Sequence, residues 1–136
     1  MAVLDWQQQL EARLTPNEQA GLAAFVERLR QRYGDDLVRV RLFGSKARGD
    51  SHDESDLDLL VVLRMKDGTY RQHWREIVDI SAEIELEYGY VTSLIIKSES
   101  DYARMCQHQL LLARNIEQDG IDLWMKQPNE LTFASA

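Results

Sequence analysis

Seven residues from Leu57 to Leu63, with the sequence LDLLVVL, form the segment that most constrains the fold. A nearly continuous apolar run of this length is typical of a central strand whose two faces are both covered by other elements. Leu37–Phe43 alternates instead, which predicts a strand with Val38, Val40 and Leu42 on one face and two solvated arginines on the other. Together the two segments predict a small sheet packed between other elements.

Apolar side chains that recur every three or four residues predict helices around these strands. The residues Thr15-Pro16-Asn17-Glu18 are typical of a helix start, with Thr15 as the cap and Glu18 completing a capping box. The apolar stripes are, in chain order, Trp6, Leu10 and Leu14; then Leu22, Val26, Leu29 and Tyr33; then Trp74, Ile77, Ser81, Ile84 and Tyr88; and a last helix from Tyr102 to Ile116, with Cys106 buried.

Two further strands complete the predicted sheet. Tyr90–Ile96 is the third strand, and Ile121–Trp124 adds a short edge strand. A chain of 136 residues has room for one domain, which we expect to span residues 1–125 and to be followed by a polar tail at 126–136. The predicted fold class is α/β (α+β), a small mixed sheet of three to four strands flanked by helices.

Composition excludes several classes of function. The formal net charge of −7 disfavours direct nucleic-acid binding, which needs a basic surface to displace counterions from phosphates. Cys106 is the only cysteine, so an internal disulfide framework and a thiolate zinc site are both excluded. No run approaches the ~18 apolar residues of a membrane-spanning helix, and the first ten residues do not resemble a signal peptide. We therefore expect no membrane association and a cytoplasmic location.

Two aspartates stand at the entrance to the central strand. Asp56 and Asp58 are separated by one residue, so their side chains are predicted to point to the same side of the sheet. Two carboxylates held this close repel each other unless a cation lies between them. Oxygen ligands of this kind suit Mg²⁺, which proteins commonly hold with one or two carboxylates together with substrate phosphates. Asp56 and Asp58 are the candidate catalytic and metal-binding residues.

A glycine and a serine follow the preceding strand directly. Gly44 allows a ligand to approach the backbone closely, and Ser45 offers a hydroxyl and an N–H at a predicted helix start, where phosphate is favoured. The pair also fits an ordinary turn with a capping serine. Arg48 adds positive charge, either to contact a triphosphate or to pair with Asp50 or Asp53. Gly44, Ser45 and Arg48 are the candidate nucleotide-binding residues.

The sequence FGSKARGDSHDESDLDLLV, in which ten residues separate Gly-Ser from Asp-x-Asp, resembles the signature of the DNA polymerase β-type nucleotidyltransferases. Chain length and element order are similar to those of the minimal nucleotidyltransferase (MNT) members. The resemblance implies the polymerase β-type fold and transfer of a nucleotide from a triphosphate such as ATP, with Mg²⁺ held by Asp56 and Asp58. It also implies that Gly44 and Ser45 hold the terminal phosphates.

The chain departs from the family pattern at one position. Full members carry a third carboxylate on the next strand, whereas Tyr90–Ile96 contains no acid and Thr92 or Ser93 is predicted to take that place. The nearby acids Glu83, Glu85 and Glu87 are expected to face solvent. A hydroxyl is a poor base and a weak metal ligand, so the substrate supplies the missing group or the activity is reduced.

Size and charge are most similar to the MNT antitoxins of HEPN/MNT toxin–antitoxin modules, as is the segment YGYVTSLII. The resemblance implies a protein adenylyltransferase that binds a HEPN-type ribonuclease toxin and transfers AMP from ATP to a hydroxyl, a tyrosine by the family's pattern. Two alternatives remain open. The protein could neutralise its partner by binding and occlusion without catalysis, or it could adenylylate a small molecule.

Overall fold

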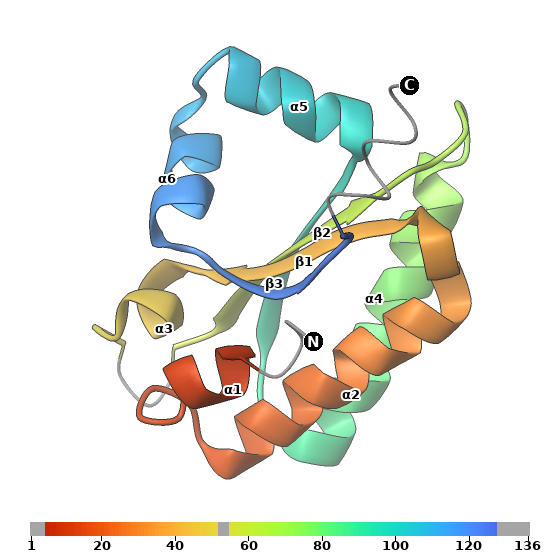
Figure 1. Ribbon diagram of the computed structural model, residues 1–136. Coiled ribbons are helices and arrows are strands. Elements are labelled where there is room, and N and C mark those ends of the chain that lie inside the picture. Colours follow the sequence, from red (N-terminus) through yellow and green to blue (C-terminus); the bar gives the residue numbers. More distant parts are fainter. Residues whose placement is uncertain (1–4, 52–54, 128–136) are drawn as a thin grey trace.

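The computed structural model describes residues 5–51 and 55–127, which fold around one four-stranded sheet (Figure 1). The strand order is β3-β2-β1-β4, with β1 at Leu37–Phe43, β2 at Leu57–Leu63, β3 at Thr92–Ser98 and β4 at Ile121–Met125. β1 runs antiparallel to both β2 and β4, whereas β2 and β3 are parallel. The prediction of a small mixed sheet flanked by helices is confirmed.

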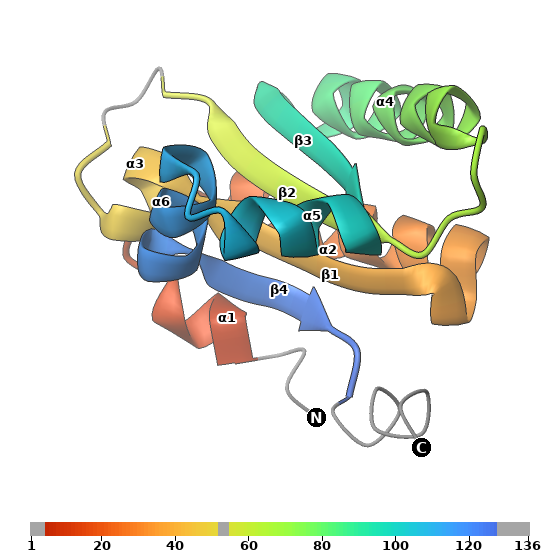
Figure 2. The ribbon, with the colours of Figure 1, turned by 90° about the horizontal axis from the view of Figure 1, so that it is seen from above.

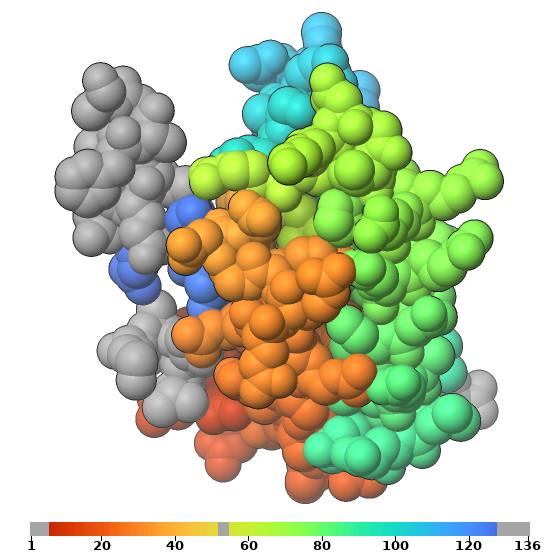
Figure 3. Space-filling model, turned by 90° about the vertical axis from the view of Figure 1, so that its right-hand side faces the viewer, coloured from red at the N-terminus to blue at the C-terminus, as the bar shows by residue number. Residues whose placement is uncertain are grey.

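Helices cover both faces of this sheet. α2 (Pro16–Tyr33) and α4 (Tyr70–Tyr88) lie side by side on one face, as the space-filling view also shows (Figure 3). α5 (Glu99–Gln107) and α6 (Leu111–Asp119) lie on the other, where α5 crosses the strands (Figure 2). Three short elements complete the described part of the chain, namely α1 (Asp5–Gln9), the 3₁₀ turn η2 (Gly34–Asp36) and α3 (Gly44–Arg48).

The central strand β2 supplies side chains to both layers of the core. Leu57, Leu59, Val61 and Leu63 belong to the larger apolar cluster beneath α2 and α4. Leu60 and Val62 belong to a smaller cluster with Tyr102 of α5 and Ile116 of α6. The continuous apolar run was therefore a correct indicator of a strand covered on both faces.

The alternation predicted for β1 is wrong at its first residues. The pairing of β1 with β2 shifts between Leu37 and Arg39, so Val38 packs against the smaller cluster while Val40 and Leu42 lie in the larger one. An extra residue in one strand turns the following side chains to the opposite face. Arg41 is also buried rather than solvated.

Three helical predictions need correction as well. Trp74, expected in the core, is 44% exposed at the outside of α4. The single helix predicted from Tyr102 to Ile116 is divided into α5 and α6, and the connection contains Gln109 with a φ of +53°. Cys106, expected to be buried, lies exposed near the end of α5.

Two side chains of α4 form hydrogen bonds with the outer edge of β3. The carboxylate of Glu85 accepts a hydrogen bond of 2.7 Å from the Thr92 backbone N–H. The Tyr70 hydroxyl donates a hydrogen bond of 2.8 Å to the Ile96 carbonyl oxygen. These two contacts satisfy backbone groups that an edge strand otherwise presents to other chains.

The described chain ends shortly after β4. Lys126, the first residue assigned to the tail, is buried, and its ammonium donates a hydrogen bond to the Asp35 carbonyl oxygen. The rest of the predicted tail, from Pro128 onward, lies outside the described residues, and the division at residue 125 stays a prediction. Within the described part of the chain, no helix combines the length and the apolar character needed to cross a membrane.

Candidate functional site

The two aspartates are held at the start of β2. Asp58 lies opposite Phe43 of β1 and Ser93 of β3, and Asp56 precedes the strand. Asp58 is partly buried and Asp56 is exposed. The pKa of Asp58 is raised, first by burial and then by the negative charge of Asp56. Ser93, the β3 neighbour of Asp58, also donates a hydrogen bond to Asp56, so both aspartates lie beside Ser93, in line with the one-residue spacing.

Gly44 brings the turn after β1 against the second aspartate. Its φ of +77° lies in the left-handed region, which favours glycine. A Cβ built on Gly44 would overlap with the carboxylate of Asp58, so no other residue fits there without moving that side chain. Ser45 follows as the second residue of the short helix α3 and is half-buried. The structure therefore brings the glycine-serine turn and the aspartates to one place.

Arg48 lies at the end of α3 and is exposed. Its guanidinium is 3.1 Å from a carboxylate oxygen of Asp50 and 3.6 Å from one of Asp119. The same charge lowers the pKa of Asp58, against the two larger effects that raise it. Arg48 thus pairs with Asp50, as one of the two interpretations predicted, and it also lies near the aspartate pair. Asp53, its other predicted partner, lies outside the described residues.

A buried ion pair beneath the turn was missed by sequence reasoning. The ammonium of Lys46 lies 3.2 Å from a carboxylate oxygen of Glu18, and both side chains are almost fully buried. Glu18 also accepts a hydrogen bond from the Thr15 backbone N–H, as the capping box predicts. On the other side of α3, the guanidinium of Arg13 donates to the Ala47 carbonyl oxygen. Contacts from α2 and from the segment before it therefore fix the position of α3.

Ser93 occupies the position expected for the third carboxylate. Its hydroxyl donates a hydrogen bond of 3.3 Å to Asp56. Thr92 points to the other face, where its hydroxyl contacts Ser81 and Glu85. The expectation that Glu85 faces solvent is therefore wrong, since its carboxylate accepts hydrogen bonds from Thr92 of β3. No group of three or more His, Cys, Asp or Glu side chains suited to a metal occurs among the residues described.

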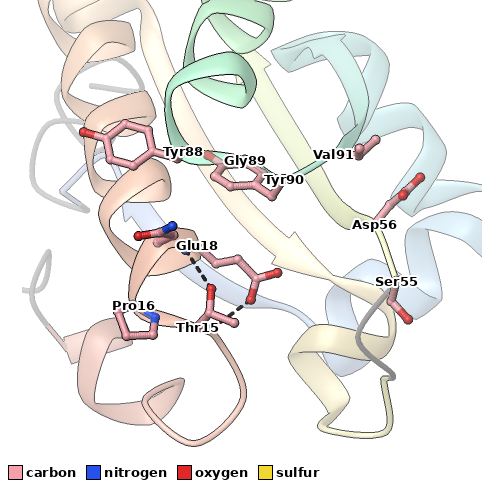
Figure 4. A pocket seen from close by; sticks show the side chains of 10 residues that line it. Thr15, Pro16, Glu18, Ser55, Asp56, Tyr88, Gly89, Tyr90 and Val91 are labelled. Atoms are coloured by element: carbon pink, nitrogen blue, oxygen red, sulfur yellow. Dashed lines mark hydrogen bonds between the residues drawn. The ribbon is translucent and has the colours of Figure 1, made fainter.

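A hollow of about 530 Å³ adjoins the first aspartate (Figure 4). It was not predicted, because its walls come from three distant segments. They are 15–18 at the start of α2, Ser55 and Asp56 before β2, and 88–91 between α4 and β3. Tyr88 and Tyr90 give it an aromatic wall opposite Thr15 and Glu18 (Figure 4). Neither Gly44 nor Asp58 lines it, so it lies on the Asp56 side of the site.

The chain is similar to known proteins over most of its length. The family described as nucleotidyltransferase domain matches residues 22–123. A provisionally named protein adenylyltransferase of Methanocaldococcus jannaschii is 36% identical over 83 residues, covering 61% of this chain and 76% of that protein. A provisionally named nucleotidyltransferase structure from Sulfolobus solfataricus has a TM-score of 0.51 at 21% identity, covering 94% of this chain and 91% of the other, a likeness of fold alone. A toxin–antitoxin structure with AMP-PNP has a TM-score of 0.45 at 19% identity, covering 82% and 79% of the two chains, and is too distant to bear on function.

Proposed function

Because the chain belongs to the nucleotidyltransferase domain family, we propose that it transfers AMP from ATP to a hydroxyl group of a partner protein. The observation that carries this proposal is the convergence of Gly44, Asp56 and Asp58. The glycine backbone is in contact with the Asp58 carboxylate, and the Asp56 carboxylate accepts a hydrogen bond from Ser93, the β3 neighbour of Asp58. The relative from Methanocaldococcus jannaschii, provisionally named a protein adenylyltransferase, supports the choice of AMP and of a protein acceptor.

Asp56 and Asp58 fit a divalent cation. Burial and mutual repulsion raise the pKa of Asp58, and a cation between the carboxylates would remove that repulsion. Oxygen ligands favour Mg²⁺. When bound, such an ion would neutralise the charge that develops on the α-phosphate during transfer of AMP. The residues that would hold it are Asp56 and Asp58, with Ser93 orienting Asp56 through its hydroxyl.

The triphosphate and the acceptor must lie on opposite sides of the aspartates. Phosphoryl-type transfers place the attacking and leaving oxygens roughly in line. We assign the terminal phosphates to Gly44 and Ser45, with Arg48 nearby, so pyrophosphate leaves on the Asp58 side. The acceptor then approaches from the Asp56 side, where the 530 Å³ hollow opens. On this proposal the hollow admits the side chain that receives AMP.

A tyrosine is the acceptor that this site suits best. β3 carries no carboxylate, and a serine hydroxyl such as that of Ser93 is a poor proton acceptor. The site therefore favours an acceptor that loses its proton readily, and a phenol with a pKa of about 10 does so more easily than an aliphatic hydroxyl. The proposed partner is a HEPN-type toxin in the cytoplasm. Its basic RNA-binding surface would complement a chain of net charge −7.

The experiment combines nucleotide binding with transfer. We expect ATP to raise the melting temperature only when Mg²⁺ is present, and we expect label from [α-³²P]ATP on a tyrosine of the partner. Asp56→Asn and Asp58→Asn should each abolish transfer, whereas Asp79→Asn, an exposed aspartate of α4, should not. Transfer that survives either of the first two substitutions would refute the assignment.

The absence of an acid from β3 favours one second candidate, neutralisation by binding without catalysis. A protein with both Asp56→Asn and Asp58→Asn would then still neutralise its partner. Loss of neutralisation with retained binding supports AMP transfer instead. Adenylylation of a small molecule, the third alternative, would appear as nucleotide turnover without any protein acceptor.

A further inference from the structure

The first turns of α4 carry a patch that the nucleotide site does not use. Its members are Tyr70, Arg71, Trp74 and Arg75, which together line a hollow of about 490 Å³, and we refer to them as the α4 patch. Tyr70 is 43% exposed and Trp74 is 44% exposed, although both are large aromatic side chains. Aromatic residues and arginine are the types that dominate binding energy at protein interfaces.

The two arginines of the α4 patch are unpaired. Neither the Arg71 nor the Arg75 side chain has an ion-pair or hydrogen-bond partner in residues 5–51 and 55–127. They lie one helical turn apart, where two like charges on a helix repel each other. The chain has seven more acidic than basic residues, so carboxylates for pairing are plentiful in the sequence. At these two positions the guanidinium groups stay available to a partner.

On the side of α4 that faces α2, by contrast with the α4 patch, the charged side chains are paired. There Glu83 lies 2.7 Å from the guanidinium of Arg28, and Glu76 lies 2.9 Å from that of Arg32. Ile77 and Ile84 point into the core. Trp74 contributes to neither contact surface and stays outside, although its spacing matches the buried stripe. The helix thus has two sides with partners and a third side on which Trp74 is exposed and both arginine side chains lack a partner within the described chain, while the half-exposed Tyr70 uses its hydroxyl to bind Ile96.

We propose that the α4 patch is the docking site for an amphipathic helix of a partner protein, one that carries two carboxylates a single turn apart beside an apolar side chain. Carboxylates at that spacing match Arg71 and Arg75, because each arginine presents a planar set of donors to one carboxylate. The apolar side chain covers Trp74 and Tyr70 and fills the hollow between them. This surface is separate from the aspartate site and shares no residue with it.

Charge complementarity favours a protein helix over nucleic acid as the occupant. Nucleic-acid affinity depends on neutralising several phosphates, and the α4 patch offers two arginines in a chain of net charge −7. A carboxylate pair needs no more than these two cations. A helix is favoured over an extended strand because Glu85 and Tyr70 already occupy the Thr92 N–H and the Ile96 carbonyl at the neighbouring edge of β3.

The test uses the full chain and a fluorescein-labelled synthetic helical peptide with two glutamates one turn apart and leucines beside them. Anisotropy should report binding at least about tenfold tighter than for the same peptide with lysines in place of the glutamates. Arg71→Glu combined with Arg75→Glu should reverse that preference, so that the lysine peptide binds better. Arg114→Glu, which changes an exposed arginine of α6, should leave both affinities unchanged.

Three results would overturn the proposal. The first is no binding of the glutamate peptide at about 1 mM, which corresponds to only about −4 kcal/mol of binding free energy. The second is tighter binding of a single-stranded RNA oligonucleotide that is lost in the double variant, which would assign the α4 patch to nucleic acid. The third is a dimer in sedimentation velocity that Trp74→Ala dissociates, which would assign it to a second copy of this chain. Magnesium-dependent ATP binding should be normal in every α4 patch variant, so the nucleotide site is judged separately.

Discussion

Replacing Gly44 with alanine tests the contact on which the nucleotide site depends. The backbone there has a φ of +77°, and a residue with a Cβ in the left-handed region costs about 1–2 kcal/mol. At about 2.1 cal/mol/K of unfolding entropy per residue, a chain of this length would lose about 3–7 °C in Tm. The new Cβ would also overlap with the carboxylate of Asp58. That carboxylate is the end of a short side chain, so it turns away at little cost in stability.

The expected effect of Gly44→Ala on Mg²⁺-ATP binding is larger than its effect on the free energy of unfolding. A ligand at about 100 times its Kd stabilises a protein by about 2.7 kcal/mol. If displacement of Asp58 weakens Mg²⁺-ATP binding about a hundredfold, the same ligand concentration gives only about 0.4 kcal/mol. We therefore expect Gly44→Ala to lose most of the rise in Tm that Mg²⁺-ATP gives the unaltered protein. Differential scanning fluorimetry with and without Mg²⁺-ATP measures this difference directly.

Gly68 provides a matched control. Its φ is +82°, and a Cβ built on it meets no atom within 4 Å. Gly68→Ala should lose a similar amount of stability through backbone strain and keep the full response to Mg²⁺-ATP. If Gly44→Ala also keeps the full response, Asp58 does not take part in nucleotide binding and the assignment of the site is wrong.

Three other perturbations follow from the same region. Lys46→Met should lower the free energy of unfolding by about 3–5 kcal/mol, because it leaves the Glu18 carboxylate buried without a positive charge beside it. Urea titration measures this, and a loss under about 1 kcal/mol would contradict it. Ser93→Asp should increase the rate of AMP transfer, because it places a carboxylate on β3. Ser93→Ala should reduce that rate no more than about tenfold, in line with the loss of one hydrogen bond to Asp56. Equal rates of AMP transfer in both variants would argue against a place for Ser93 beside the metal. The pKa of Asp58 is raised in the folded state, so the folded protein binds a proton there at higher pH than the unfolded chain does. The free energy of unfolding therefore increases as the pH falls from neutral through that raised pKa toward the ordinary value of 3.8. Asp58→Asn should remove this part of the pH dependence in urea titrations, and an unchanged profile would contradict it.

Local pattern was sufficient to predict the elements that build the site. The apolar run of β2 and the capping box of α2 both depend only on residues that are neighbours in the chain. Both predictions are confirmed. The resemblance to nucleotidyltransferases, stated on the spacing between Gly-Ser and Asp-x-Asp, is confirmed by the family match. From the same spacing we predicted that Gly44, Asp56 and Asp58 lie together, and the structure places them so. The roles assigned to these residues stay predictions.

What the sequence did not reveal depends on contacts between distant segments. Periodicity showed that Trp74 shares a stripe with buried residues, but it did not show that the core ends before reaching it. The bulge after Leu37 arises from the pairing of two strands and has no signal in β1 alone. The pair between Lys46 and Glu18 joins residues far apart in the chain, and one sequence offers no means to match them.

The two side chains of α4 that cover β3 also determine how this protein can associate. With Glu85 and Tyr70 in place, the Thr92 N–H and the Ile96 carbonyl are already occupied, which makes it less favourable for a strand of another copy to pair with this edge. The opposite edge of the sheet, formed by β4, has no such contacts from α4. Truncating both residues would expose hydrogen-bonding groups in a strand whose neighbour is almost wholly apolar, and such a protein would be prone to fibrous aggregation.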